Sequence, residues 1–446
     1  MRKRFHILTF GCQMNANDSA WLARALTDRG HVPSSREEAD VHILNTCSVR
    51  AKPEDKVYTE LGRISLLAQK SPERKILACV GGCVAQQCGE RLFARSRELR
   101  LLFGTDGLAA APEAIDLLLS DPQRKITLLD FNETFAEQGH KLKAAATGPA
   151  ALVSIMRGCD NFCAYCIVPL VRGRQKSRGS EDILAECRAL IAGGAREITL
   201  LGQNVNSFGQ DSLGDGSSFS TLLYRVAELP GLARLRFMTS HPKDMAPALV
   251  QAFAQIPLLA PRLHLPLQSG SDRVLRAMGR GYTRAEYIAL VCALRQARPD
   301  IHISTDIIVG FPGENEQDFE DTLDAMQEAD FCASFSFVYS DRPGTKAATM
   351  PDKIPPALAL ERLSRLQVWQ NHNSARILEA MRGQSAHVLL EGPSLKNPAS
   401  SWSGREAHDF AVNLYIPPAH GATTGDMLKV RITGSGKPTL KGELAE

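Results

Sequence analysis

The chain has 446 residues, of which 44% are hydrophobic and 23% charged, and its formal net charge is +3. This length predicts two to four domains. Because the net charge is small, the electrostatic field of the whole protein is weak, and a nucleic-acid partner would have to be recognised through local patches of charge. There is no apolar run of the roughly 18 residues that a membrane span needs, and the apolar stretch behind the basic first residues is too short for a secretory signal, so we expect a cytoplasmic protein.

Residues 1–125 alternate between strand and helix patterns. Short apolar runs predict strands at 5–10, 40–46, 75–82 and 99–104, and helical spacing of apolar residues predicts helices at 17–30, 52–70, 88–96 and 112–120. Such alternation is typical of a parallel sheet with helices packed on it. Residues 126–150 show little periodicity, which predicts a linker.

The alternation resumes at residue 151. Strands are expected at 151–156, 197–202, 235–240, 262–267, 303–311 and 334–340. Six such units predict a partial (β/α)6 barrel over residues 151–382, ending in a helical connector, with the active site at the carboxyl ends of the strands. Residues 383–446 contain short strands separated by Gly, Pro and Ser, which predicts a small antiparallel β-barrel. The predicted fold class is therefore α/β with a small β-barrel at the end of the chain.

The sequence "RGCDNFCAYC" places Cys159, Cys163 and Cys166 in one loop directly after the first barrel strand. Metal sites that are closed by protein ligands alone normally use four ligands. A 4Fe-4S cluster that is held by three cysteines keeps one iron open, as a catalytic metal does for its substrate. A zinc site is the alternative, although no partner pair of cysteines or histidines lies nearby.

A second set of three cysteines lies in residues 1–125. Cys12, Cys47 and Cys83 each come at or just after the end of a predicted strand, and the carboxyl ends of parallel strands share one edge of a sheet. We therefore expect these thiols to converge on a second 4Fe-4S cluster. The cysteines within apolar patterns are instead expected to be small buried residues: Cys79, Cys88, Cys187, Cys292 and Cys332.

The cysteine loop and the barrel pattern resemble those of radical S-adenosylmethionine enzymes. Together with the second cysteine set and the final barrel, which is similar to a TRAM domain, they resemble the methylthiotransferases of that superfamily. The motifs "TFGCQMNANDS", "NTCSVRAKPEDK", "GCVAQQCGE" and "STDIIVGFPGE" look most like the branch that acts on N6-dimethylallyladenosine in tRNA.

The resemblance implies an activity with its cofactors and partners. The activity would be methylthiolation of C2 of the adenine next to the anticodon, with two 4Fe-4S clusters and S-adenosylmethionine. S-adenosylmethionine itself would be the fourth ligand of the first cluster. The partners would be the tRNA anticodon stem-loop, a low-potential electron donor and a sulfur source. The final barrel, residues 383–446, would bind RNA.

Residues at the predicted strand ends are candidates to contact S-adenosylmethionine. The resemblance places Tyr165 near its adenine, and it places Gly202, Gln203 and Asn204 near its methionine part. Gln268 and Gly310 close two later strands, where Gly310 would allow close backbone approach. The alternative, which is equally simple, is that these residues are polar strand ends and turn glycines that bind no ligand. We expect His241 and His264 to be structural.

Four cations follow the cysteine loop within seven residues: Arg172, Arg174, Lys176 and Arg178. Beside a site for RNA, such a run predicts contacts to phosphate or to the cosubstrate carboxylate, whereas elsewhere it would be a solvated face. Gln175 stands where the family usually has glutamate.

Two other functions remain open at this point. One is a methylthiotransferase that acts on threonylcarbamoyladenosine in tRNA or on a ribosomal-protein aspartate. The other is a zinc-stabilised RNA-binding protein without catalysis.

Overall fold

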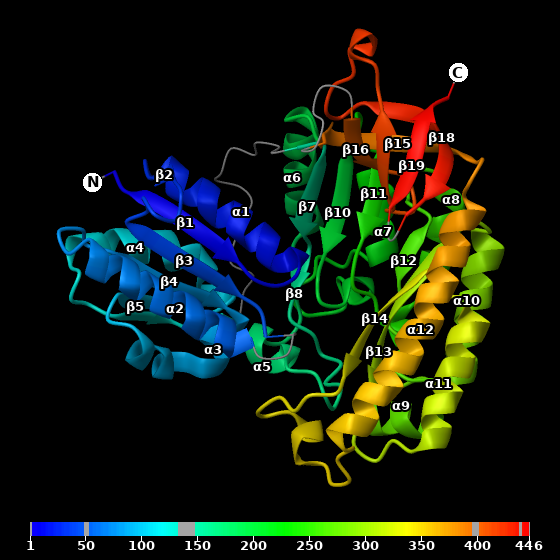
Figure 1. The fold of residues 1–446 in the computed structure, drawn as a ribbon, viewed down its shortest axis with the longest axis horizontal. Coiled ribbons are helices and arrows are strands. Elements are labelled where there is room, and N and C mark those ends of the chain that lie inside the picture. The colour runs from blue at the N-terminus through cyan, green and yellow to red at the C-terminus, as the bar shows by residue number, and fades with distance from the viewer. Residues whose placement is uncertain (1, 49–52, 133–147, 395–400, 437–438, 446) are drawn as a thin grey trace.

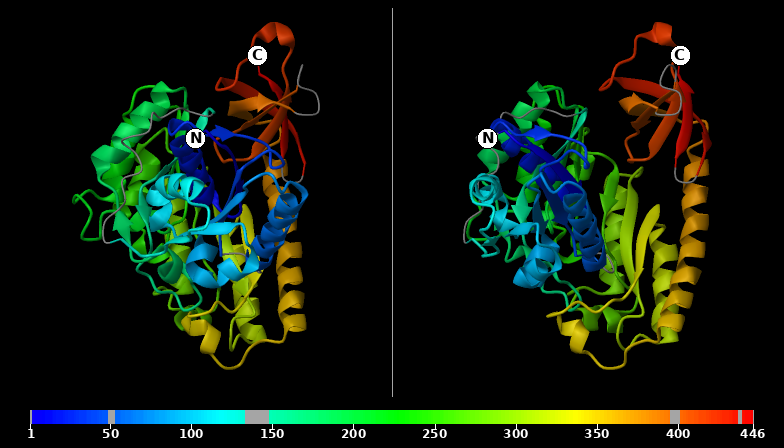
Figure 2. Two further views of the ribbon diagram at one scale, coloured as in Figure 1. Left: turned by 90° about the vertical axis from the view of Figure 1, so that its left-hand side faces the viewer. Right: turned by 60° about the vertical axis from the view of Figure 1, so that its left-hand side comes forward.

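The computed structural model describes residues 2–48, 53–132, 148–394, 401–436 and 439–445. An N-terminal domain lies beside a larger barrel domain, and a small β-barrel follows at the end of a long helix (Figures 1 and 2). In the described ranges, no helix combines the length and the apolar character that crossing a bilayer requires.

The N-terminal domain is a parallel sheet covered by helices on both faces, as the sequence predicts. The strands lie in the order β2-β1-β3-β4-β5-β6, with bounds β1 (Arg4–Thr9), β2 (Val32–Pro33), β3 (Val41–Thr46), β4 (Leu77–Gly82), β5 (Leu99–Phe103) and β6 (Ile126–Leu128). Successive side chains of a strand point to opposite faces, so one face packs on α1 (Gln13–Asp28) and α4 (Ala111–Ser120). The other face packs on α2 (Pro53–Lys70) and α3 (Cys83–Cys88).

The domain boundaries given in the sequence analysis stay predictions. The short strand β6 lies within the range 126–150, where we expected a linker, and it pairs with β5 in the first sheet. Residues 133–147 of that range lie outside the described residues. Two short 3-10 helices complete this domain, η1 (Gly89–Arg95) and η2 (Asp106–Ala110).

The barrel domain contains two three-stranded parallel sheets, in the orders β11-β10-β7 and β12-β13-β14. Their strands are β7 (Ala150–Ser154), β10 (Glu197–Leu201), β11 (Arg234–Phe237), β12 (Arg262–His264), β13 (His302–Val309) and β14 (Ala333–Val338). A parallel bridge between Leu235 and Leu259 joins the two sheets. The six strands therefore follow one another as a partial barrel, which confirms the predicted fold.

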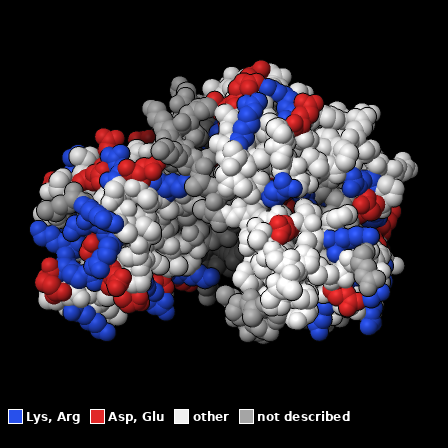
Figure 3. All heavy atoms as spheres, turned by 90° about the horizontal axis from the view of Figure 1, so that it is seen from above, with Lys and Arg blue, Asp and Glu red and all other residues white. Residues whose placement is uncertain are grey.

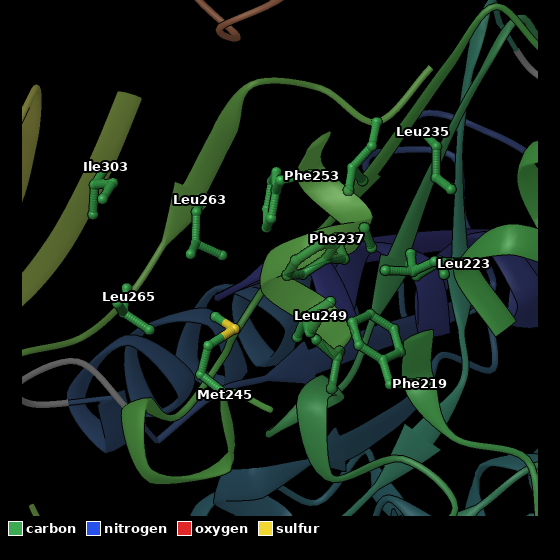
Figure 4. Packing of buried hydrophobic residues seen from close by; sticks show 14 of the residues in the cluster. Phe219, Leu223, Leu235, Phe237, Met245, Leu249, Phe253, Leu263, Leu265 and Ile303 are labelled. Carbon is green, nitrogen blue, oxygen red and sulfur yellow. The ribbon is translucent and has the colours of Figure 1, made fainter. Parts of the chain in front are cut away.

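Helices cover the outside of this barrel. They are α6 (Ser180–Ala192), α7 (Phe219–Ala227), α8 (Pro247–Gln255), α9 (Asp272–Met278), α10 (Arg284–Ala297), α11 (Glu316–Ala329) and the connector α12 (Pro356–Ala380). Figure 4 shows the core between strands and helices, where the Phe237 ring lies 5.0 Å from that of Phe219 and 5.7 Å from that of Phe253. Because alternate strand residues enter this core, the remaining ones line the inner face of the barrel.

The final domain is a closed five-stranded barrel in the order β15-β16-β17-β19-β18. Its strands are β15 (Ser385–Pro393), β16 (Ser401–Arg405), β17 (Ala411–Tyr415), β18 (Met427–Ser435) and β19 (Leu440–Leu444), with the 3-10 turn η6 (Pro418–His420). β17 and β19 pair in parallel, whereas the other neighbours are antiparallel. The prediction of an antiparallel barrel is corrected at this pair, because β19 forms an antiparallel hairpin with β18 and then closes the barrel in parallel beside β17.

Arginines at the amino ends of barrel strands hold the final domain in place. Arg236 donates hydrogen bonds to the carbonyl oxygens of Glu406 and Ala407 at 3.0 and 2.9 Å. Arg262 donates to that of His408 at 2.7 Å, and Arg234 makes similar contacts. The final domain therefore lies at the end of the barrel opposite to the carboxyl ends of the strands (Figure 1).

Candidate active site

The first cysteine set occupies a tightly held loop at the carboxyl end of the barrel. The loop begins after β8 (Met156–Arg157), which pairs with β9 (Lys176–Ser177), and it ends at α5 (Val168–Arg172). The Cys166 amide donates to the Cys163 carbonyl at 2.9 Å, and the Ala164 amide donates to the Met278 carbonyl at 2.8 Å. Gly158 has φ +72, and a Cβ at this position would lie 2.0 Å from the Arg174 carbonyl oxygen. A glycine is therefore needed where the loop begins.

Burial disfavours the thiolate forms of Cys159 and Cys166. Burial, followed by the neighbouring Cys163, raises the pKa of Cys166 to about 12, and burial also raises the pKa of Cys159. The buried guanidinium of Arg280 donates to the Cys163 sulfur at 3.3 Å, to the Tyr165 hydroxyl at 3.4 Å and to the Pro266 carbonyl at 3.0 Å. Sequence reasoning missed Arg280, although the glycines on both of its sides were a signal of special backbone geometry.

Unpartnered polar atoms gather where β10, β11 and β12 end. Buried atoms without a hydrogen-bond partner among the described residues include Asn204 Oδ1, Ser240 Oγ, His241 Nε2 and Gln268 Oε1. Buried polar groups normally have partners, so such atoms point to a ligand that supplies them. Burial, followed by the charge of Arg280, lowers the pKa of His241 to about 2, which keeps its ring neutral. We expected His241 to be a structural residue whose polar atoms all have partners, and its Nε2 does not meet that expectation.

The remaining strand-end candidates have contacts within the protein. Gln203 Oε1 accepts from the Gly158 amide at 2.7 Å and so fixes the start of the cysteine loop. A Cβ on Gly202 would lie 2.4 Å from Met156 Cγ, and one on Gly310 would lie 2.7 Å from Ala359 Cβ. Packing therefore explains both glycines without a ligand. His264 is paired at both ring nitrogens, with Ser304 at 3.2 Å and Asp306 at 3.3 Å, as expected for a structural residue.

The second cysteine set converges at the carboxyl edge of the N-terminal sheet. Cys12 caps α1, Cys47 directly follows β3 and Cys83 begins α3 after β4, and β1, β3 and β4 are neighbours. Hydrogen bonding from Cys47 lowers the pKa of Cys12 to about 5 and that of Cys83 to about 6. Gly11 has φ +125, and a Cβ there would lie 2.2 Å from Cys47 Cβ. The three thiols thus meet around a backbone segment that only glycine allows.

The other cysteines are mostly core residues. Cys79, Cys88, Cys187 and Cys332 are buried, as predicted, whereas Cys292 is exposed. The prediction for Cys292 is wrong because α10 buries Tyr287, Val291 and Leu294, and Cys292 lies one position beyond that stripe. Among the described residues, no three His, Cys, Asp or Glu side chains are arranged to hold a single metal ion.

Residues of the barrel domain complete the surroundings of the second cysteine set. Cys83 packs in one small cluster with Ile167 and Val171, and Ile167 directly follows Cys166 in the chain. The charge of Arg172, from the same helix, contributes to lowering the pKa of both Cys83 and Cys12. Burial lowers the pKa of Arg342, on the loop after β14, while the charge of Cys47 acts in the opposite direction. The two cysteine sets therefore lie on either side of the same domain interface.

The basic run after the cysteine loop is mostly buried. Arg172 lies 3.9 Å from Asp18, Lys176 pairs with Asp106, and Arg178 pairs with Glu186 at 2.7 Å. Asp18 and Asp106 belong to the N-terminal domain, so Arg172 and Lys176 join the two domains. The side chain of Arg174 is 72% exposed and pairs with Asp160 at 2.7 Å. Of this run, Arg174 is the residue that faces solvent.

Gln175 is held in place because its side-chain amide both donates and accepts hydrogen bonds. Its Nε2 donates to the Ser207 carbonyl at 2.6 Å and to Asp211 Oδ2 at 3.2 Å, and its Oε1 accepts from the Ser207 hydroxyl at 2.6 Å. A carboxylate at this position would face two acceptors. We expect Gln175→Glu to lower the free energy of unfolding by about 1–3 kcal/mol, the cost of an unsatisfied buried group. Urea denaturation measures this, with the exposed Gln210→Glu as the matched control, and equal midpoints for the two variants would contradict it.

The fold and the cysteine loop define a radical S-adenosylmethionine enzyme. Residues 153–326 match the Radical SAM superfamily, and residues 4–104 match a group described as Uncharacterized protein family UPF0004. The chain is 55% identical over 99% of its length to the tRNA-2-methylthio-N(6)-dimethylallyladenosine synthase of Nitratidesulfovibrio vulgaris, strain Hildenborough, of which it covers 98%. It is 44% identical over its full length to that of Moorella thermoacetica, of which it covers 99%. The chain belongs to this family of radical SAM methylthiotransferases.

Solved structures show the same fold at low sequence identity. The radical S-adenosylmethionine methyltransferase TsrM from Kitasatospora setae matches with a TM-score of 0.56 and 13% identity, covering 78% of this chain and 75% of that one. The cobalamin-dependent S-adenosylmethionine radical enzyme OxsB matches with a TM-score of 0.54 and 12% identity, covering 83% of this chain and 56% of that one. Membership of the radical SAM superfamily implies S-adenosylmethionine and a 4Fe-4S cluster as cofactors. The three-thiol loop and the unpartnered atoms beside it fit these groups.

Proposed function

We propose that the chain replaces the hydrogen at C2 of N6-dimethylallyladenosine, next to the anticodon of tRNA, with a methylthio group. The names of its relatives supply the substrate class. We further propose that two 4Fe-4S clusters take part. The observation that carries this second proposal is the packing of Cys83 against Ile167, because it brings the two thiol sets to one interface.

In this proposal, Cys159, Cys163 and Cys166 hold the first cluster. With S-adenosylmethionine and one electron from a low-potential donor, that cluster supplies a 5′-deoxyadenosyl radical. Asn204 Oδ1 and Gln268 Oε1 are acceptors, which suit the amino and hydroxyl groups of the cosubstrate, and the neutral His241 ring adds a further polar atom. Tyr165, held by Arg280, would lie near the adenine.

Cys12, Cys47 and Cys83 would hold the second cluster, from which sulfur is delivered. Arg172 and Arg342 place positive charge beside these thiols, and this charge stabilises the thiolates that a cluster requires. Their position at the domain interface fits a reaction in which sulfur and radical must reach the same carbon.

The proposed reaction balances as follows. The C2–H bond breaks, and its hydrogen atom goes to the 5′-deoxyadenosyl group of one S-adenosylmethionine, which also yields methionine. Cleavage of that S-adenosylmethionine consumes the one electron from the low-potential donor. A C2–S bond then forms between the C2 radical and sulfide-level sulfur from the sulfur source. The one electron released in this step would be taken up by the second cluster, so the reaction is redox-neutral overall. The methyl group on that sulfur comes from a second S-adenosylmethionine, which leaves as S-adenosylhomocysteine.

We propose that tRNA is bound through local cations and the final barrel. Figure 3 shows lysine, arginine and acidic side chains intermixed over the face seen from above, without one extended basic surface. Arg174 is exposed beside the cysteine loop, and its guanidinium lies 5.1 Å from the ring centre of Phe162. It is therefore the member of the basic run that can reach a phosphate.

Replacing Arg174 with alanine should remove one phosphate contact. We expect the slope of log K against log salt for tRNA binding to fall in magnitude by roughly 0.7–0.9. Fluorescence anisotropy at several salt concentrations measures this. The exposed Arg188 on α6 gives the matched variant Arg188→Ala, which should leave the slope unchanged, and equal slopes for both variants would rule out the Arg174 contact.

Nucleoside mass spectrometry tests the function itself. Protein that is purified without oxygen, reduced and supplied with S-adenosylmethionine and a sulfide source should convert N6-dimethylallyladenosine in tRNA to its 2-methylthio form. Parallel reactions with tRNA that carries threonylcarbamoyladenosine, and with ribosomal protein, cover the alternatives. Product in one of these reactions and none with the dimethylallyl substrate would overturn the proposed substrate. Colourless protein that contains zinc and no iron would overturn the enzyme assignment.

A further inference from the structure

The inner face of the barrel carries two exposed aromatic side chains on β14. Phe335 is 55% exposed and Phe337 is 44% exposed. On the neighbouring strand β13, Ile303, Ile307 and Val309 enter the core among the helices, so the alternate residues Asp306 and Ile308 point to the inner face. Phe335 pairs with Asp306 and Phe337 pairs with Ile308 in the parallel register, which places both rings on that inner face.

This aromatic surface continues to the candidate active site. Ile308, the neighbour of Phe337, packs with Tyr165, Phe311 and Tyr339 in one apolar cluster, and Tyr165 lies within the cysteine loop. Tyr339 follows β14, and the loop behind it brings Arg342 to Cys47. The carboxyl end of β14 therefore lies beside both cysteine sets.

Polar groups border the aromatic surface on one side. The His264 ring meets the Phe335 ring edge to face at 5.8 Å between their centres, and His264 pairs with Asp306 at 3.3 Å. Both ring nitrogens of His264 are thus already paired. An incoming carboxylate would find neither of them open, whereas an uncharged alkyl group needs no such partner.

We propose that Phe335 and Phe337 form the wall that holds the unstacked purine of the RNA substrate together with the apolar group on its N6. Unpaired bases are commonly bound by stacking on aromatic side chains, and a branched alkyl group on N6 adds apolar surface to bury. Because His264 is already paired with Asp306 and Ser304, its ring does not offer an open nitrogen to the carboxylate that ends the side chain of threonylcarbamoyladenosine. This inference rests on the proposed function and names the residues that would set its substrate.

RNA binding by the full-length holoenzyme tests the wall. The probes are anticodon stem-loops that differ at one position: adenosine, N6-dimethylallyladenosine or threonylcarbamoyladenosine. Wild type should bind the dimethylallyl RNA best and the threonylcarbamoyl RNA no better than the unmodified one. Phe335→Ala and Phe337→Ala should each lower the affinity for the dimethylallyl RNA by roughly 5- to 150-fold, which is the contribution of one stacked base to binding. Each variant should therefore also lose the preference for the dimethylallyl RNA over the other two probes. Phe337→Tyr, which keeps a ring, should stay within a few-fold of wild type.

Two controls separate the wall from folding and from the function. Val368→Ala removes another exposed apolar side chain, from the outside of α12, and should leave affinity unchanged. Release of 5′-deoxyadenosine without RNA should be the same in Val368→Ala as in wild type, and far-UV circular dichroism should show that all variants are folded. If wild type methylthiolates tRNA but the alanine variants keep the preference, the wall is overturned and the function stands. If wild type does not methylthiolate tRNA, both are overturned.

Discussion

A variant with Cys12, Cys47 and Cys83 all replaced by alanine should release 5′-deoxyadenosine but form no methylthiolated nucleoside. The barrel has its own core, separate from the two clusters that pack the N-terminal sheet, so the first cysteine loop should stay folded. Reconstituted without oxygen, the variant should hold about half the wild-type iron, as expected when one of two cysteine-bound clusters is lost. Iron analysis, liquid chromatography of 5′-deoxyadenosine and nucleoside mass spectrometry are the measurements.

The matched control is Cys292→Ala, because Cys292 is exposed and lies outside both sets. It should behave as wild type in all three measurements. Arg172 keeps Asp18 as a partner in the triple variant, so removing the thiols does not leave this buried guanidinium without an opposite charge, and the loss of stability is limited. Methylthiolation by the triple variant would show that sulfur delivery does not depend on these cysteines. Full iron content would show that they hold no cluster.

A variant with Cys159, Cys163 and Cys166 all replaced by alanine should lose both 5′-deoxyadenosine release and methylthiolation. Reductive cleavage needs an iron that is open to the amino and carboxylate groups of S-adenosylmethionine, and this loop lies beside the unpartnered atoms of Asn204, His241 and Gln268. Arg280 keeps the Pro266 carbonyl and Tyr165 as partners, so the surrounding structure should hold. The variant should again contain about half the iron.

The two triple variants differ in one measurement, which makes the pair informative. Both should fail to methylthiolate tRNA, but only the barrel variant should fail to release 5′-deoxyadenosine. Continued reductive cleavage by the barrel variant would overturn the assignment of its cysteine loop. A full loss of iron in either variant would show that the two sites do not assemble independently.

The sequence by itself determined the local architecture and the candidate cluster ligands. The spacing of apolar residues that distinguishes strands from helices involves residues only a few positions apart. The parallel sheet, the six barrel strands and α12 could therefore be predicted. The cysteines could be placed because each follows a strand, and the carboxyl ends of parallel strands share an edge. Strands β16 and β19 could not be placed individually, because "SWSGR" and "LKGEL" are short and show little alternation of apolar residues.

Only the tertiary structure decided which distant residues meet. The run Arg172–Arg178 predicts contacts to phosphate or to the cosubstrate carboxylate, yet Arg172 and Lys176 are buried, because their carboxylate partners Asp18 and Asp106 come from another domain. The packing of Cys83 on Ile167 and the exposure of Phe335 and Phe337 on the inner face of the barrel likewise depend on how domains and sheets are placed. The local pattern of a sequence records whether a side chain suits a strand or a helix. It does not record what will pack against that side chain from 70 or more residues away.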